Sequence, residues 1–113
     1  MDWGTIELEP EVEEWLRQLP TAHFQRAAFY IDLLAEQGPR LREPYSRHLG
    51  GGLRELRFHL DGDSYRITYW FAIERRIILL TKFRKTRMCE RREVARAQRA
   101  RLRCVEMDHD AED

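Results

Sequence analysis

Side chains able to bind a phosphate and to move a proton alternate with apolar ones between residues 53 and 71. Because successive strand residues point to opposite faces, Glu55, Arg57 and His59 share one face of a strand over this segment. Arg66 falls on the matching face of the strand that follows. Guanidinium groups bind phosphate oxygens, and an imidazole exchanges a proton near neutral pH. The pattern is compatible with acid–base chemistry on a phosphate, although a lone strand histidine is often a bystander.

The segment LRELRFHLDGDSYRITYWF predicts a β-hairpin, since Asp61-Gly62 separates two runs of alternating polarity. A two-residue turn sets Arg57 opposite Arg66, and a four-residue turn shifts the pairing but keeps the faces. Two arginines across a strand pair repel unless Glu55, or a phosphate from outside, neutralises them. A charged outer face is also ordinary for an antiparallel sheet. In either register the core face holds Leu56, Phe58, Leu60, Tyr65, Ile67, Tyr69 and Phe71.

The remaining sequence predicts the elements that position this hairpin. A short strand at Thr5 to Leu8 precedes two amphipathic helices, which Pro20 separates and Gly38-Pro39 closes. Residues 40–52 are expected to form a loop. RRIILLTKF supplies a third strand after the hairpin, and Glu90 to Arg103 a third helix. The predicted fold class is α+β: an N-terminal strand and a two-helix hairpin packed on a small twisted antiparallel sheet, plus a C-terminal helix.

The charge of the chain is segregated along the sequence, although its formal net charge is zero. Residues 75–103 carry twelve Lys or Arg against two Glu, whereas residues 104–113 carry five acids and no Lys or Arg. The end of the third strand is expected to bring Lys82, Arg84, Lys85 and Arg87 to the polar face of the hairpin and form a basic cleft. We expect one domain over residues 1–105 and a disordered acidic tail over residues 106–113.

Several functional classes are disfavoured by the sequence. No apolar run, residues 77–80 included, is long enough for a membrane span or a signal peptide, so a cytoplasmic location is expected. Cys89 and Cys104 lack the spacing of a metal site, and the three consecutive glycines at 50–52 are not followed by the Lys-Ser/Thr of a phosphate loop. Neither a cofactor nor a metal is expected. Trp70, on the polar face, either stacks on a base or lies under the third helix.

The order and spacing of three segments resemble the RelE/ParE superfamily of bacterial toxins, in particular its HigB-like branch, also described as phage-derived Gp49-like proteins. The segments are Gly52 to Arg57, Tyr65 to Tyr69 and Leu79 to Arg87, and the resemblance extends over residues 3–102. It implies the α+β fold predicted above and a type II toxin. It also implies a metal-independent mRNA interferase that cleaves in the ribosomal A site through attack of the RNA 2′-hydroxyl. The implied partners are a helix-turn-helix (HigA-like) antitoxin, the ribosome and mRNA, with operator DNA bound only through the antitoxin.

The resemblance also implies roles for individual positions. Arg57, Arg66, Arg84 and Lys85 match basic catalytic positions, with Arg66 placed to hold the scissile phosphate, and Glu55 or His59 is the candidate base. The sequence departs from its relatives in two ways: residues 87–90 contain no tyrosine, and no Lys-Thr-Pro element follows the last strand. These departures leave the general acid of the reaction unassigned. The arginines of residues 91–103 lie on the third predicted helix. They are equally compatible with a face exposed to solvent and with a face that binds RNA. The expected contacts to RNA or the ribosome are Lys82, Arg87, Arg91, Arg92, Arg96 and Arg99.

Two other functions are compatible with the same fold. ParE-type relatives inhibit DNA gyrase without being enzymes, and an inactive relative would only bind an antitoxin and operator DNA. The clustered polar face formed by Arg57, His59, Arg66 and Arg84 favours the nuclease, since a cleaving protein needs it and an inhibitor does not.

Overall fold

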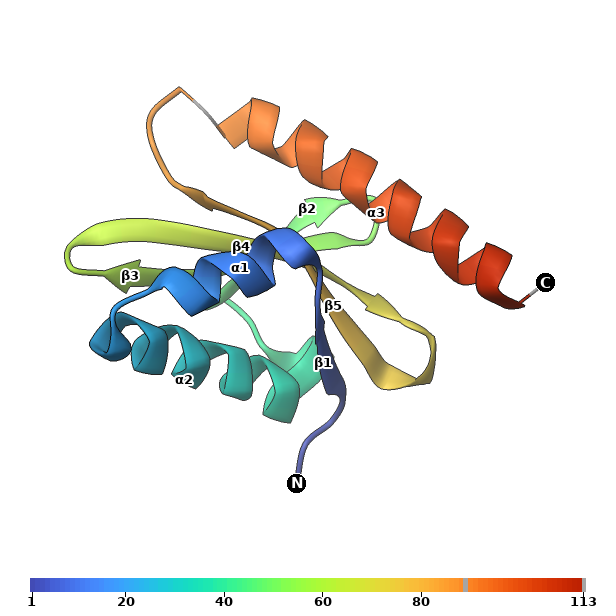
Figure 1. Cartoon of the computed structure of the whole chain (residues 1–113), viewed down its shortest axis with the longest axis horizontal. Helices are drawn as coiled ribbons and strands as arrows, with labels where there is room; N and C mark the ends of the chain where they lie inside the picture. The colour runs from blue at the N-terminus through green and yellow to red at the C-terminus, as the bar shows by residue number, and fades with distance from the viewer. Residues whose placement is uncertain (89, 113) are drawn as a thin grey trace.

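Five strands form one mixed sheet in the order β1–β5–β4–β3–β2 (Figure 1). The computed structural model describes the backbone of residues 1–88 and 90–112, and the side chains of residues 1–88 and 90–106. Neighbouring strands are antiparallel except that β1 pairs parallel with β5. The strands are β1 (Thr5–Leu8), β2 (Ser46–Gly50), β3 (Leu53–Leu60), β4 (Asp63–Ala72) and β5 (Arg76–Arg84).

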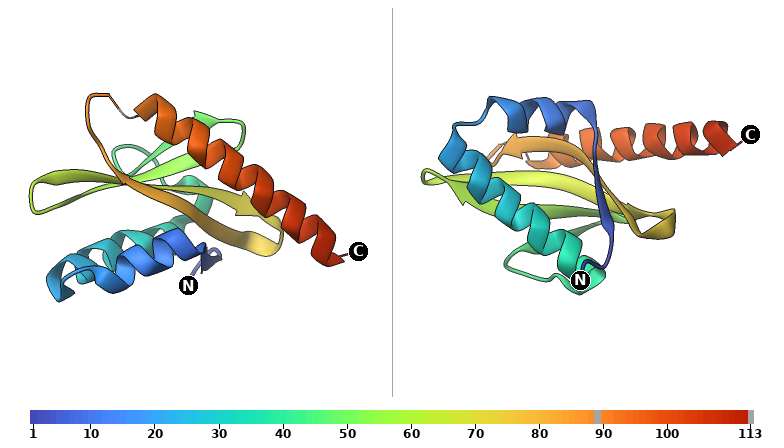
Figure 2. Two further views of the ribbon diagram at one scale, coloured as in Figure 1. Left: turned by 45° about the horizontal axis from the view of Figure 1, so that its top comes forward. Right: turned by 60° about the horizontal axis from the view of Figure 1, so that its bottom comes forward.

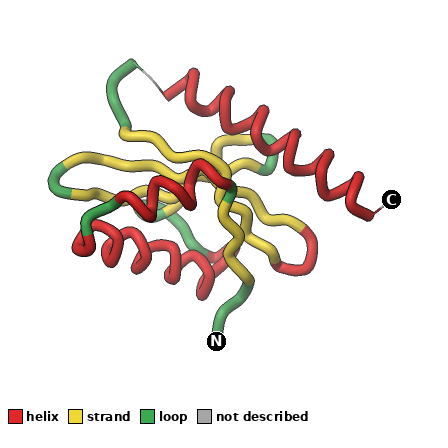
Figure 3. The backbone as a smooth tube through the Cα atoms, viewed as in Figure 1, coloured by secondary structure: helices red, strands yellow, loops and turns green. Residues whose placement is uncertain are grey.

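Helices cover both faces of this sheet (Figures 2 and 3). The hairpin of α1 (Pro10–Gln18) and α2 (Thr21–Gln37) lies on one face, and α3 (Glu90–Glu112) crosses the other. Short 3-10 turns follow α2 at Gly38–Arg40 and precede β5 at Ile73–Arg75. Of the helices in the described residues, none is both long and apolar enough to cross a bilayer.

The main core lies between the sheet and the helical hairpin. The core face predicted for the β-hairpin is confirmed: Leu56, Phe58, Leu60, Ile67 and Tyr69 are buried, and Tyr65 and Phe71 pack at the margin. The helices contribute the apolar positions that recur at helical spacing. These include Val12, Leu16, Ala27, Ile31 and Leu34. Burial of this face therefore fixes which side of the hairpin points away from α1 and α2.

A second, smaller core lies under α3. Leu53, Trp70, Ile78 and Leu80 of the sheet pack against Ala97 and Cys104 of the helix. Trp70 thus takes the second of its two predicted places, with the Arg101 guanidinium 5.1 Å from its ring centroid. Part of the face that alternation marks as polar is therefore covered by protein.

The turn of the β3–β4 hairpin has two residues. Leu60 pairs with Asp63 and Arg57 with Arg66, as the shorter of the two predicted turns requires. Asp61 and Gly62 both have positive φ angles, 51° and 86°, which a two-residue turn matched to the twist of the strands needs.

Two strands differ from the prediction. The sheet is not purely antiparallel, because β1 runs parallel to β5, and residues 46–50 of the expected loop form the edge strand β2. Neither difference has a strong signal in the local sequence. β2 contains one aliphatic residue, and the partner of β1 is β5, which lies far away along the chain. The parallel pairing of β1 with β5 therefore depends on a contact between distant segments rather than on a pattern in its own residues.

A bulge in β5 separates basic residues that were expected to lie together. Thr81 pairs with Thr68 and Leu79 with Tyr69, which leaves Leu80 as an extra residue. Beyond the bulge, Lys82 lies opposite Ile67, on the side of the helical hairpin, and its ammonium is 5.9 Å from the Trp15 ring centroid. Arg84 follows on the same side. The structure therefore does not form the single basic cleft that alternation predicted.

The third helix is longer than predicted and is fastened by ionic contacts. It continues past Arg103 to Glu112, through the segment expected to form the acidic tail. Ala97 is buried and Ala100 packs at the margin, whereas Leu102 points to solvent. Arg96 reaches across to Glu11 of α1, with Nη1 and Nη2 donating to the two carboxylate oxygens at 2.5 and 3.0 Å.

Candidate functional site

A buried carboxylate lies between two arginines on the face of the sheet away from α1 and α2. Glu55 is fully buried, and its Oε2 is 3.5 Å from Arg57 Nε and 3.4 Å from Arg66 Nε. Since Arg57 and Arg66 are paired across β3 and β4, Glu55 compensates from inside the protein the repulsion expected between them. Neither oxygen of Glu55 accepts a hydrogen bond from the described residues.

Burial perturbs both charges at the centre of this cluster. Desolvation raises the pKa of Glu55 above its ordinary value, against the opposing effect of Arg66 and Arg57, and Glu90 at the start of α3 adds to the rise. Desolvation and the neighbouring Arg57 lower the pKa of Arg66, which nevertheless remains a cation at neutral pH. Two fixed positive charges thus lie beside a carboxylate that is poorly solvated.

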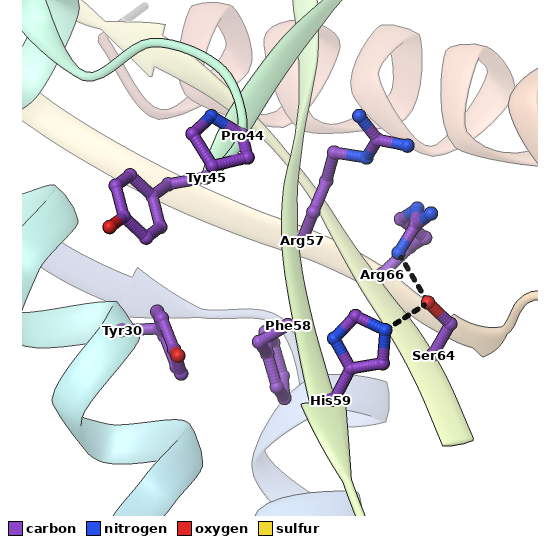
Figure 4. Close-up of a pocket in the computed structure, with 8 residues that line it drawn as sticks. All are labelled: Tyr30, Pro44, Tyr45, Arg57, Phe58, His59, Ser64 and Arg66. Atoms are coloured by element: carbon purple, nitrogen blue, oxygen red, sulfur yellow. Dashed lines mark hydrogen bonds between the residues drawn. The ribbon is translucent and has the colours of Figure 1, made fainter. Parts of the chain in front are cut away.

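Ser64 links this cluster to His59. The Ser64 Oγ lies 3.3 Å from His59 Nε2 and accepts a hydrogen bond from Arg66 Nη1 at 3.3 Å (Figure 4). Arg66 Nη1 also donates to the Tyr65 carbonyl at 3.1 Å. Ser64 lies two residues before Arg66 on β4, so alternation puts it on the same polar face, but its residue type alone indicates no role. The signal that identifies it is its register, because the two-residue turn pairs Ser64 directly with His59.

These groups open into a cavity of about 430 Å³ that crosses the outer edge of β3. The crossing is possible because β2 pairs only as far along β3 as Leu56. In the described residues, the bond from the Arg57 N–H to the Tyr45 carbonyl, at 2.8 Å, is the last backbone-to-backbone hydrogen bond along this edge. Arg57, His59, Ser64 and Arg66 lie on one side of the strand, and Tyr30, Tyr45 and Phe58 on the other (Figure 4). The cavity therefore joins a cationic wall to an aromatic one.

Comparison with known proteins identifies the family of the chain. The model of the family described as "Phage derived protein Gp49-like (DUF891)" matches residues 14–103. The chain belongs to this Gp49-like family. No curated protein matches it.

The fold of this Gp49-like protein is that of the RelE toxins. A mutant of E. coli toxin RelE in the free state is similar with a TM-score of 0.60 and 16% identity, over 91% of this chain and 98% of the toxin. A chain of the archaeal RelE–RelB complex from Pyrococcus horikoshii OT3 has a TM-score of 0.55 and 26% identity, over 74% of this chain and 97% of that one. Both the family resemblance and the fold class predicted from the sequence are confirmed.

The structure of this family member brings only part of the predicted site together. Glu55, Arg57, His59 and Arg66 form one cluster, and the Lys85 N–H donates to the Ser64 carbonyl at 2.8 Å beside it. Lys82 and Arg84 lie toward the other face, where Arg84 Nη1 is 3.7 Å from Asp63 Oδ2.

The predicted RNA contacts beyond β5 divide into two groups. Arg87, Arg91, Arg92 and Arg99 are exposed, as an RNA-binding surface requires. Arg96 is instead partly buried and hydrogen-bonded to Glu11 and Glu93, and these hydrogen bonds raise its pKa further. Its assignment to RNA is not supported by this geometry. Among the described residues, no group of three His, Cys, Asp or Glu side chains is arranged to hold a metal ion.

Proposed function

We propose that this protein is the toxin of a type II toxin–antitoxin system and cleaves mRNA bound to the ribosome. The observation that carries the proposal is the pair of Arg57 and Arg66 around buried Glu55, linked through Ser64 to His59, which opens into the cavity at the edge of β3. Membership of the Gp49-like family and the RelE fold add support. A site built from fixed cations suits a reaction in which negative charge develops on a phosphate.

In the proposed reaction the RNA attacks itself. The 2′-hydroxyl oxygen forms a bond to the adjacent phosphorus and loses its proton to a base, while the bond to the 5′-oxygen breaks and that oxygen takes up a proton. The products are a 2′,3′-cyclic phosphate and a 5′-hydroxyl. All electrons stay within the substrate, so the reaction needs no redox partner.

The geometry favours different roles for the groups around the cavity. The side chain of Arg57 is 23% exposed and can reach a phosphate oxygen, whereas that of Arg66 is 4% exposed and orients Ser64 from behind. His59 is exposed at the wall of the cavity and exchanges the proton, since Glu55 is covered on every side. Glu55 then acts as a positioning residue that holds the two guanidinium groups in place.

The proposed partners follow from the same function. The archaeal structure with this fold is a complex of RelE with RelB. By analogy we expect a cognate antitoxin here, a helix-turn-helix protein of the HigA type. We expect the toxin to bind operator DNA only through this antitoxin. Because the proposed substrate is mRNA bound to translating ribosomes, we expect the protein to act in the cytoplasm.

The test is translation of a defined mRNA in a purified system, with new 5′ ends mapped by primer extension. We expect cleavage at A-site codons, absent without ribosomes. Arg57→Gln should reduce the cleavage rate by a factor of about 10² to 10³. Arg17→Gln is the matched control, because Arg17 is an exposed arginine of α1 that pairs with Glu13.

Intact mRNA in the presence of a folded, monodisperse wild-type protein would refute the nuclease proposal. A supercoiling assay would then examine inhibition of DNA gyrase, the main alternative that the sequence left open. Equal loss of cleavage in Arg57→Gln and Arg17→Gln would instead refute the assignment of the site.

A further inference from the structure

A second cavity adjoins the candidate site on its aromatic side. It encloses about 480 Å³ and shares Tyr30 and Tyr45 with the first cavity. Phe29 and Leu33 of α2 extend its aromatic and apolar wall, and Arg40 and Arg42 line its other side. We call this cavity the tyrosine groove. Because two of its residues also line the site, a chain lying in one cavity can continue into the other.

The aromatic rings of the tyrosine groove are stacked on the core and exposed at its mouth. Tyr30 lies on Phe58 at a centroid distance of 5.5 Å and an interplanar angle of 13°. Tyr45 is the next ring outward, 6.2 Å from Tyr30 and tilted by 35°. Tyr45 is 42% exposed and Phe29 62% exposed, so each offers an apolar ring face that the protein leaves uncovered. Flat aromatic faces of this kind are platforms on which nucleobases stack.

The charge around the tyrosine groove is predominantly positive. Arg40 and Arg42 line it, and Arg26 lies over the Tyr30 ring at 5.6 Å from the centroid, whereas Glu43 is the acid in the lining. On the far side of β3 the cationic wall of the candidate site continues this field. Arginines next to exposed aromatic rings suit a single-stranded nucleic acid. The arginines can bind its phosphates, and its unpaired bases can stack on the rings.

We propose that the tyrosine groove is a nucleobase-binding subsite for single-stranded RNA, and that it holds the nucleotide next to the one whose phosphate lies at Arg57. This inference rests on the proposed nuclease function, which it deepens. The backbone would cross the edge of β3, with the scissile phosphate on the side of Arg57 and His59. The neighbouring base would stack on Tyr45, and the following phosphate would meet Arg42. Paired RNA would not fit, since its bases are already stacked in the duplex.

A peptide is the competing occupant, because an apolar helix face also suits a partner protein. The balance of charge favours RNA, since the lining carries two arginines against one acid and leads into a wall of further cations. The tyrosine groove is also continuous with the cavity where the proposed reaction takes place. Binding of the antitoxin at this position is the alternative that the test below distinguishes from RNA binding.

The direct test uses an RNA that the protein cannot cleave. A single-stranded hexanucleotide carrying 2′-O-methyl groups lacks the attacking hydroxyl, and its binding can be followed by NMR through the backbone amides. We expect shifts in residues of the tyrosine groove as well as in Arg57 and His59. Tyr45→Ala should weaken binding about 5- to 150-fold, the effect of losing one stacked base, whereas Tyr45→Phe should remain within about threefold.

The variants are chosen to stay folded. The Tyr45 N–H donates to the Arg42 carbonyl, and its own carbonyl accepts from Arg57, so the substitution at Tyr45 leaves these backbone bonds in place. Phe24→Ala is the matched control, because Phe24, on α2, is an aromatic residue of similar exposure (45%) that does not line the groove. In the translation assay Tyr45→Ala should raise the mRNA concentration needed for cleavage more than it lowers the maximal rate.

The possible failures are distinguishable. Unchanged hexanucleotide affinity in Tyr45→Ala, or no shifts in the tyrosine groove at millimolar hexanucleotide, overturns the inference and leaves the nuclease proposal standing if the wild type cleaves. Weakened affinity in a protein that does not cleave supports the subsite and refutes the proposed function. Loss of antitoxin co-purification with unchanged RNA affinity makes the groove a protein interface and overturns the inference.

Discussion

Replacing Arg96 by methionine tests whether α3 is fastened to the rest of the fold by an ionic network. Besides its two bonds to Glu11, Arg96 Nη2 is 2.8 Å from Glu93 Oε2 and donates to the Lys82 carbonyl at 3.2 Å. The Lys82 N–H in turn donates to Glu11 Oε2 at 3.0 Å. One guanidinium therefore joins α3 to α1 and β5. Methionine keeps much of the apolar stem and removes every one of these bonds.

The expected loss of stability follows from the exposure of the pair. The side chains of Arg96 and Glu11 are 34% and 33% exposed, so the pair lies between a surface ion pair and a buried one. Surface pairs contribute about 0–1 kcal/mol, and breaking a buried pair costs about 3–5 kcal/mol. We expect Arg96→Met to lower the free energy of unfolding by about 2 kcal/mol. For a chain of this length, that corresponds to a fall in Tm of roughly 6–10 °C.

The same network predicts how this stability depends on pH. Burial pushes the pKa of Glu11 up, but the hydrogen bonds from Arg96 and from the Lys82 N–H outweigh burial and bring it below the ordinary value of 4.5. A carboxyl group whose pKa is lowered by folding stabilises the protein above its unfolded pKa. That contribution is lost as the pH falls through the folded value. The difference between wild type and Arg96→Met should therefore shrink below pH 4.5.

A double-mutant cycle in urea isolates the pair. It compares wild type, Arg96→Met, Glu11→Gln and the double variant at neutral pH and at about pH 3, where the coupling should be smaller. Arg99→Met is the control, as Arg99 is an exposed arginine of the same helix. We expect a coupling energy above about 1 kcal/mol at neutral pH. A loss in Arg96→Met no larger than in Arg99→Met, together with weaker ribosome binding, would refute the reasoning and return Arg96 to the RNA surface.

Three further predictions concern the site and its frame. Ser64→Ala should lower the maximal cleavage rate about tenfold without changing the mRNA concentration dependence, and Ser64→Thr should restore it, since Ser64 orients His59. Burial raises the pKa of Glu55, so its protonated carboxyl stabilises the fold at low pH, and this contribution is lost as the pH rises above 4.5. In urea unfolding, the free energy of unfolding of Glu55→Gln should therefore increase relative to wild type as the pH rises from 4.5. Gly38→Ala should lower the free energy of unfolding by about 2–4 kcal/mol, because the φ angle of Gly38 is +55° and an added Cβ would lie 2.4 Å from the Trp3 ring. A Tm within about 2 °C of wild type would contradict this.

Local features of the sequence were sufficient for much of the fold. The helical hairpin is confirmed because its apolar positions repeat at helical spacing and a proline or glycine ends each helix. The β3–β4 hairpin is confirmed because alternation and Asp61-Gly62 act over a few residues. Once the register is known, Glu55, Arg57, His59 and Arg66 fall on one face. The common face of these four residues, out of six predicted catalytic positions, is therefore a consequence of a single turn.

The features that the sequence did not predict depend on contacts between distant segments. The bulge at Leu80 lies in a run of apolar residues that fits either face, so nothing local showed that Lys82 and Arg84 would turn toward the helical hairpin. Arg96 looks like its exposed neighbours until α3 is placed beside Glu11. The tyrosine groove likewise combines α2 with the segment before β2, which alternation left as a loop.

The open edge of β3 has a consequence for the solubility of the molecule. Beyond Leu56 the strand outruns its neighbour β2, so the backbone groups around His59 face outward, as they must for RNA to cross there. Such an edge is also a template on which another chain can add a strand and begin aggregation. The Arg26 Nε donates to the His59 carbonyl at 2.7 Å and so occupies an acceptor that an added strand would need. Arg26→Ala should therefore leave the isolated fold intact while making the protein more prone to self-association at high concentration.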